Sequence, residues 1–95
     1  MRGEAIRLDG VVIGVADVCG IQSYPGRFEI KASRVILDGS RLPLPDGPVR
    51  TVDTTSWDLK VGDEKGMRFE SWKVGAFKDG SHLLENVVFR RDQEE

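Results

Sequence analysis

The stretch from Trp57 to Phe89 constrains the fold most, because it consists of three extended runs separated by polar turns. The first run, Trp57–Val61, alternates between apolar and polar residues, and this period places successive side chains on opposite faces of a strand. A polar turn bracketed by glycines leads to Met67–Phe77, and a Lys-Asp-Gly-Ser turn leads to Leu83–Phe89. The stretch therefore predicts a three-stranded antiparallel meander that buries Trp57 and Phe89.

The dipeptide Asp-Gly occurs four times along the chain and marks tight turns. Asp9–Gly10 separates two apolar runs, and this dipeptide favours the type I′ turn of a β-hairpin because both central residues need a positive φ. In the strand that follows, residues 11–18, both the odd and the even positions are mostly apolar, so both faces of the strand are apolar and we expect it at the centre of a sheet. Gly14 interrupts this strand, which predicts a bulge or the close approach of another backbone.

The part of the chain after residue 18 is less regular. Residues 19–27 show little periodicity, and we expect a connecting loop there. The apolar parity of residues 28–37 slips near Ser33, which indicates a bulge or a bend. Apolar spacing of three and four residues does not persist anywhere over three turns, so we expect at most one short helical turn.

Many short strands joined by frequent turns predict an all-β fold, a small antiparallel barrel or sandwich of about six to eight strands. A chain of 95 residues corresponds to one domain. We expect this domain to span residues 1–90, and the charged residues 91–95 to form a frayed tail.

Charge and cysteine content exclude several classes of function. The 14 Lys and Arg residues are balanced by 16 Asp and Glu residues, and the formal net charge of −2 disfavours a nucleic-acid partner. Cys19 is the only cysteine, so neither an intrachain disulfide nor a zinc site built from several thiolates can form. The sequence shows no signal peptide and no apolar run long enough to cross a membrane. We therefore expect a cytoplasmic protein without cofactors and without a membrane partner.

The side chains that could carry catalysis lack partners at recognisable spacings. His82 is the only histidine, and no second histidine or cysteine stands near it to form a triad or a zinc site, so we expect a solvent-facing strand residue. Cys19 has no neighbouring cation or helix start to activate its thiol, which predicts an inert, buried cysteine. Glu70 and Glu85 could face each other across the last hairpin, but nothing fixes the separation that a glycosidase requires. The sequence therefore predicts a protein that is not an enzyme.

Trp72 is the aromatic residue whose position the sequence leaves open. Met67 and Phe69 share one parity in their strand, whereas Trp72 and Val74 share the other. Either a bulge turns Trp72 into the core, or Trp72 lies on the outer face as a binding or oligomer contact. In the second case the face around Trp72 could bind a small ligand or single-stranded nucleic acid, because exposed aromatic residues beside Lys and Arg can stack on bases.

The segment Arg41–Pro48 alternates leucine with proline and cannot form a central strand, because proline lacks the N–H donor that a β-ladder needs. Leu42 and Leu44 either plug one end of the fold or belong to an extended arm that docks on a partner. A second copy of the chain is the simplest such partner, since most soluble oligomers are symmetric homo-oligomers. The sequence thus predicts a protein-interaction or assembly module, with Leu42, Leu44 and Trp72 as candidate interface residues.

Overall fold

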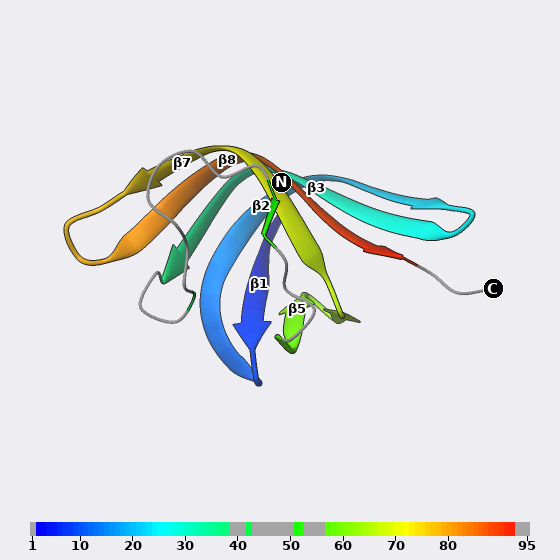
Figure 1. The fold of residues 1–95 in the computed structure, drawn as a ribbon, viewed down its shortest axis with the longest axis horizontal. Coiled ribbons are helices and arrows are strands. Elements are labelled where there is room, and N and C mark those ends of the chain that lie inside the picture. The colour runs from blue at the N-terminus through cyan, green and yellow to red at the C-terminus, as the bar shows by residue number, and fades with distance from the viewer. Residues whose placement is uncertain (1, 39–41, 43–50, 53–56, 93–95) are drawn as a thin grey trace.

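The computed structural model describes residues 2–38, 42, 51–52 and 57–92, and every regular element in them is a β-strand (Figure 1). The strands are β1 (Arg2–Leu8), β2 (Val11–Tyr24), β3 (Arg27–Asp38), β4 (Thr51–Val52), β5 (Leu59–Val61), β6 (Glu64–Lys65), β7 (Arg68–Ala76) and β8 (Ser81–Asp92). They form one antiparallel sheet in the order β4-β7-β8-β3-β2-β1-β5-β6. The all-β prediction is confirmed.

The sheet is strongly curved and is not closed, since β4 and β6 stand at its two edges. In Figure 1 it arches over the interior, with the β2–β3 hairpin reaching one end of the molecule and the β7–β8 hairpin reaching the other. The molecule measures 43 × 25 × 22 Å. The concave face holds the core, and we call the convex face the outer face.

Tight turns connect β1 to β2 and β7 to β8 at two of the four Asp-Gly dipeptides, whereas the turns predicted at Asp38–Gly39 and Asp46–Gly47 involve residues outside the described part of the chain. Asp9 and Gly10 have φ values of 52° and 79°, so both central residues of the β1–β2 turn adopt the left-handed conformation of a type I′ turn. Gly80 has a φ of 91° in the β7–β8 turn, where the Phe77 N–H donates to the Ser81 carbonyl. Both hairpin predictions are confirmed.

The loop predicted at residues 19–27 is wrong. β2 continues to Tyr24 and β3 begins at Arg27, so a two-residue turn at Pro25 and Gly26 joins them. The alternation of apolar and polar residues is weak here because the hairpin projects beyond the core. Its outer half on β2 is exposed on both faces, and burial therefore imposes no pattern on the sequence.

Gly14 marks the close approach of a neighbouring backbone, as predicted. It pairs with Leu37 of β3, and a Cβ atom added at Gly14 would lie 2.3 Å from the carbonyl oxygen of Ile36. The register of β1 against β2 shifts beside it, between Ile6 and Arg7. Glycine is therefore required at this position by contact with the next strand.

The last two strands pair as predicted, with Phe69 opposite Phe89, but the first strand of the predicted meander lies elsewhere. The residues Leu59–Val61 form β5, which pairs with β1 and β6 rather than with β7. The prediction assumes that strands joined by a short turn pair with each other. Instead, β5 pairs with the edge of β1 on the far side of the sheet. The Met67 N–H still donates to the Leu59 carbonyl at 3.3 Å, so the chain before β7 remains in contact with β5.

The core lies on the concave face and draws on most of the strands. Its buried apolar residues are Ile6, Ile13, Ala16, Ile30, Ala32, Val35, Leu37, Leu42, Leu59, Val61, Met67, Phe69, Leu84, Val87 and Phe89. The rings of Phe69 and Phe89 are tilted against each other, with centroids 6.0 Å apart. Burial of Phe89 is confirmed, whereas Trp57 is only partly buried against this core.

The strands β2, β3 and β8 each have an irregularity at neighbouring positions across the sheet. On β3, Ala32 and Val35 are both buried although they are three residues apart, so the parity slips at Ser33 as predicted. The register of β2 against β3 shifts beside Cys19, and Asn86 on β8 has a φ of 55° at the same level. These irregularities coincide, and irregular residues of this kind bend a sheet and increase its twist.

The strand β8 extends through Asp92, so the first two residues of the predicted tail belong to the sheet. The Arg91 guanidinium donates to the Lys65 carbonyl at 2.9 Å and to the Glu64 carboxylate at 3.2 Å. It also lies over the ring of Phe28, 5.2 Å from the centroid. These contacts tie the end of β8 to the β5–β6 hairpin.

Candidate interaction surface

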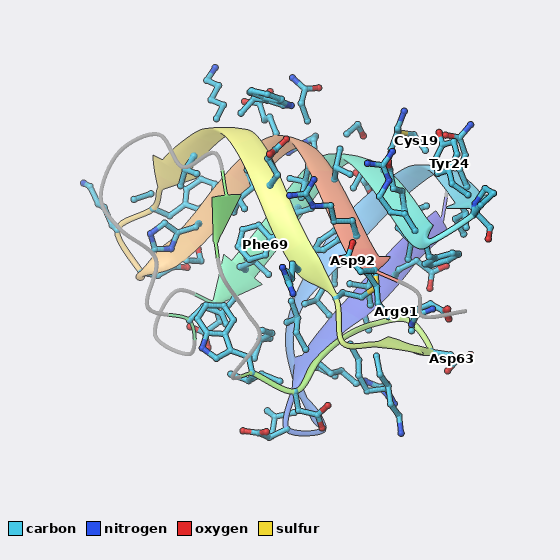
Figure 2. All side chains as sticks on the ribbon, turned by 45° about the vertical axis from the view of Figure 1, so that its right-hand side comes forward. Cys19, Tyr24, Asp63, Phe69, Arg91 and Asp92 are labelled. Carbon is cyan, nitrogen blue, oxygen red and sulfur yellow. The ribbon has the colours of Figure 1, made fainter. Side chains whose placement is uncertain are left out.

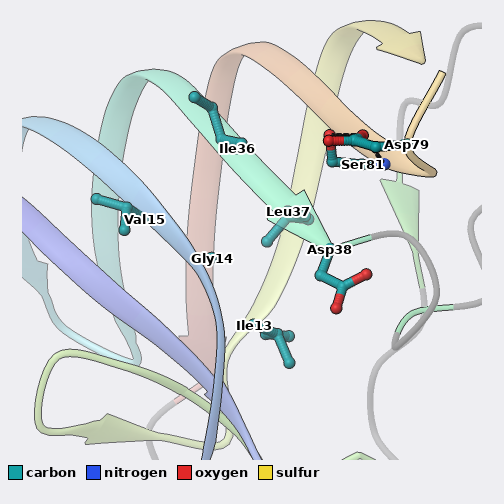
Figure 3. A pocket seen from close by; sticks show the side chains of 8 residues that line it. All are labelled: Ile13, Gly14, Val15, Ile36, Leu37, Asp38, Asp79 and Ser81. Atoms are coloured by element: carbon teal, nitrogen blue, oxygen red, sulfur yellow. Dashed lines mark hydrogen bonds between the residues drawn. The ribbon is translucent and has the colours of Figure 1, made fainter. Parts of the chain in front are cut away.

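A continuous apolar row crosses the outer face. Its members face one another on five neighbouring strands, and none of them carries a charge. The apolar row consists of Ala5, Val15, Ile36, Leu83 and Gly75. Val15 and Ile36, which are paired, are 49% and 46% exposed. Figure 3 shows these two side chains on the opposite side of their strands from Ile13 and Leu37, which belong to the core.

A row of alternating charge borders the apolar row on one side. It contains Asp17, Arg34, Glu85 and Lys73, in the order of their strands. Lys73 Nζ lies 3.6 Å from Glu85 Oε1. Opposite charges on neighbouring strands support the observed register. An apolar strip with a charged border is typical of a protein interface, whose centre is depleted of charge and whose rim is polar.

The apolar row also borders a hollow at the place where β2 and β3 separate (Figure 3). The hollow has a volume of about 550 Å³ and is lined by Ile13, Gly14, Val15, Ile36, Leu37, Asp38, Asp79 and Ser81. The Ser81 hydroxyl and backbone N–H donate to Asp79 Oδ1 at 2.6 and 2.9 Å. These bonds hold the pKa of the Asp79 carboxyl below its ordinary value. The hollow therefore combines apolar lining residues with the carboxylates of Asp38 and Asp79, and Asp79 stays ionised at neutral pH.

Trp72 lies on the outer face and is 51% exposed, which decides between the two positions that the sequence leaves open. Ser71 is buried and Lys73 is exposed, so the parity of β7 slips here without turning the indole inward. Next to Trp72 is a second hollow of about 280 Å³. This hollow is lined by Cys19, Lys31, Ala32, Ser33, Trp72, Asn86, Val87 and Val88.

The candidates from the proline-rich segment differ from Trp72. Leu42 is 1% exposed and belongs to the chain's own core. Leu42 is thus not available to a partner. This agrees with the interpretation in which the leucine plugs one end of the fold. Leu44 lies outside the described residues. Among the described candidates, Trp72 alone lies at the surface.

The histidine and the cysteine that could carry catalysis lie in places that the sequence does not predict. His82 faces the concave side, because it shares a row with the core residue Leu37, and its Nδ1 is buried without a bond from the described residues. The prediction of a solvent-facing histidine is therefore wrong. Cys19 is exposed rather than buried, because the register shift beside it turns its side chain outward, and Sγ lies 3.5 Å from the Lys31 carbonyl oxygen.

The carboxylates do not form a catalytic pair. Glu70 lies opposite Val88 and Glu85 lies opposite Lys73, so the two glutamates do not face each other across the β7–β8 hairpin. Among residues 2–38, 42, 51–52 and 57–92, no three His, Cys, Asp or Glu side chains are grouped as a metal site would need. In the same part of the chain, no helix has the length and apolarity to cross a membrane.

Comparison with known proteins gives no relative. Protein-family models, curated proteins and solved structures all lack a significant match to this chain.

The apolar row was not predicted, although the sequence carries a signal for it. Residues 11–18 are apolar on both parities, which normally indicates a strand buried on both faces. The described residues form one sheet with its core on the concave side, so the second apolar parity lies on the outer face. A strand of this kind indicates either a second packed layer or an interaction surface.

Proposed function

We propose that the protein is a non-enzymatic interaction module that binds a partner protein on its outer face. The observation that carries this proposal is the apolar row, in which Val15 and Ile36 lie side by side with about half of each residue exposed. Single exposed apolar residues are common on soluble proteins, whereas contiguous ones with a polar border mark interaction sites.

The dimensions of the apolar row suit a protein better than a small molecule. Five strands spaced about 4.8 Å apart give a strip roughly 19 Å long. Such a strip fits the centre of a protein interface, around which the charged row supplies polar contacts. A cytoplasmic location is part of the same proposal, and the unpaired, exposed Cys19 thiol supports it because such thiols persist in reducing compartments.

Site-specific photo-crosslinking tests this function. A photoreactive residue in place of Val12, which is 55% exposed beside the apolar row, should yield one discrete covalent adduct in an extract of the cells that make the protein. The substitution Ile36→Asp should abolish this adduct while the chain stays folded with a modestly lower melting temperature, because Ile36 is not in the core but aspartate is a poor strand residue. A photoreactive residue at Asp58, which is exposed away from the row, is the control. An adduct that survives Ile36→Asp, or that also forms from position 58, would refute the proposal.

A second candidate function is the binding of a small ligand or single-stranded nucleic acid at Trp72. The observation that favours it is the half-exposed indole beside a hollow to which Lys31 contributes a cation. Titration with a single-stranded oligonucleotide should quench the indole fluorescence in a salt-dependent manner, because aromatic stacking and charge both contribute. Trp72→Ala should remove the response, and Trp57→Phe should leave it intact. Fluorescence that does not change with oligonucleotide would exclude this binding.

A further inference from the structure

Among the described residues, the second half of β2 has a neighbouring strand on one side only. The described part of β1 ends at Arg2, which pairs with Val18, whereas β2 continues to Tyr24. Of residues Cys19–Tyr24, the last five pair with β3 on one side and Cys19 lies at the register shift before them, and no strand among the described residues lies on the other side. We call these six residues the β2 edge. Figure 2 labels the residues at its two ends, Cys19 and Tyr24, at the periphery of the molecule.

The β2 edge lacks most of the features that prevent edge strands from pairing with other chains. Native edges are usually short, or they carry lysine, other charges or proline. The strand at one limit of the sheet, β6, follows this rule with only Glu64 and Lys65, and β4 at the other limit is equally short. The β2 edge has six residues, Cys-Gly-Ile-Gln-Ser-Tyr, with no charge and no proline. It also exposes Ile21 by 52%.

We propose that the β2 edge pairs antiparallel with the β2 edge of a second copy of this chain, so that two sheets join into one. A two-fold axis makes the pairing self-complementary, because each strand offers the other the same sequence of N–H donors and carbonyl acceptors. The absence of charge means that two identical edges do not repel each other. On β3, opposite the β2 edge, Arg27 and Glu29 are joined at 3.1 Å, and Lys31 lies opposite Gly20 with its side chain exposed.

The concave side of the β2 edge has room for a side chain of the second copy. Ile21 faces this side, since it pairs with the buried Ile30. It lines a hollow of about 290 Å³ together with Glu4, Phe28, Ile30, Val61, Gly62, Asp63 and Glu64. In an antiparallel sheet, side chains that face each other lie on the same side. A second Ile21, delivered by the partner strand, would therefore meet the apolar residues Phe28, Ile30 and Val61 of this lining, to which Glu4, Asp63 and Glu64 add carboxylates.

Every register in which one residue faces its own copy satisfies the two-fold axis and keeps Ile21 on the concave side, and two of these registers pair the most residues of the β2 edge. In the first register Ile21 faces Ile21 of the other copy, and in the second register Gln22 faces Gln22. Residues that face each other across an antiparallel pair have Cα atoms about 4.5–5.5 Å apart, within reach of a disulfide. Single cysteines can therefore identify the register directly.

The test combines mass in solution with crosslinking. Light scattering on the full chain at up to about 1 mM should show a concentration-dependent dimer. Ile21→Lys should weaken the association at least tenfold, because a charge on a strand edge opposes pairing, while its melting curve at low concentration stays that of the parent. Val11→Lys is the matched control, since Val11 is exposed on the same strand but outside the β2 edge, and it should leave the dimer intact.

Crosslinking supplies the second measurement, in a Cys19→Ser background. On oxidation, either Ile21→Cys or Gln22→Cys should form a disulfide dimer faster than Ile36→Cys, an exposed position on the outer face. A parent that stays monomeric at the highest concentration would overturn the proposal. Equal crosslinking from positions 21, 22 and 36 would do the same. A dimer that resists Ile21→Lys but is lost in Ile36→Asp would refute the β2 edge and place the contact on the apolar row instead.

Discussion

Replacing Gly14 with alanine tests the contact between β2 and β3 most directly. The added Cβ would lie 2.3 Å from the Ile36 carbonyl oxygen and 2.7 Å from Leu37 Cδ2. Optimal contacts between carbon atoms are about 3.5–4.0 Å, so the strands would have to separate by roughly 1 Å. The leucine side chain can rotate away, but the carbonyl oxygen is fixed by the backbone. Overpacking usually costs about 1–3 kcal/mol, and we expect the upper end of this range.

A cost of about 3 kcal/mol would lower the melting temperature of a domain of this size by roughly 12–24 °C. Circular dichroism during heating measures this shift. Gly20→Ala is the matched control, because Gly20 lies on the same strand and a Cβ there would meet nothing within 4 Å. We expect Gly20→Ala to melt close to the parent. If both alanine variants melted together, β2 and β3 could not approach as closely as the structure shows.

Three further substitutions test other parts of the fold. Gly10→Val should lower the free energy of unfolding by about 1 kcal/mol or more, because a β-branched residue resists positive φ; a urea midpoint equal to that of the parent would contradict the type I′ turn. Leu42→Ala should cost about 2–5 kcal/mol without changing the mass in solution, and an altered mass with parental stability would instead indicate a docking arm. Hydrogen bonds from Ser81 lower the folded-state pKa of Asp79, so their stabilisation is complete above the unfolded pKa and is lost as the pH falls through the folded one. The melting temperature of Asp79→Ala should therefore fall less steeply with falling pH than that of the parent. Parallel falls in the two melting temperatures would contradict this contribution.

The features predicted correctly are those that depend on nearby residues. The turn at Asp9–Gly10 follows from the φ values that the dipeptide tolerates, and the slip at Ser33 follows from a change of apolar parity within one strand. Gly14 belongs to the same class, since glycine inside an apolar strand usually has a packing reason. Each of these signals is contained in fewer than ten residues of sequence.

The sequence predicts wrongly where a residue's position depends on distant strands. The run Leu59–Val61 has the alternation of a strand, but alternation does not say which edge it joins, and β1 was available. Residues 19–24 lack alternation because their hairpin extends past the core, although Gly20–Tyr24 pair with β3 without a break. Sequence periodicity reports burial rather than backbone conformation, so an exposed strand can be mistaken for a loop.

The candidate site shows the same limit. The sequence identifies Trp72 as a candidate, but the side of the sheet on which Trp72 lies depends on where the alternation along β7 slips, and neighbouring strands fix that position. The row of Val15 and Ile36 joins strands that lie apart in the sequence, and only the register of β2 against β3 aligns them. A surface assembled from five strands leaves no local motif in any one of them.

The two proposed surfaces are compatible, since one lies on the outer face and the other on a strand edge. A two-fold axis perpendicular to the joined sheet would turn both outer faces to the same side, and the dimer would then present two apolar rows together. A partner with two matching sites could engage both, and linked binding of this kind raises apparent affinity by about 10²–10⁴ without any new contact. Pairing of the β2 edges would then raise the affinity for a divalent partner without contacting it. Ile21→Lys would lower that affinity while leaving each apolar row unchanged.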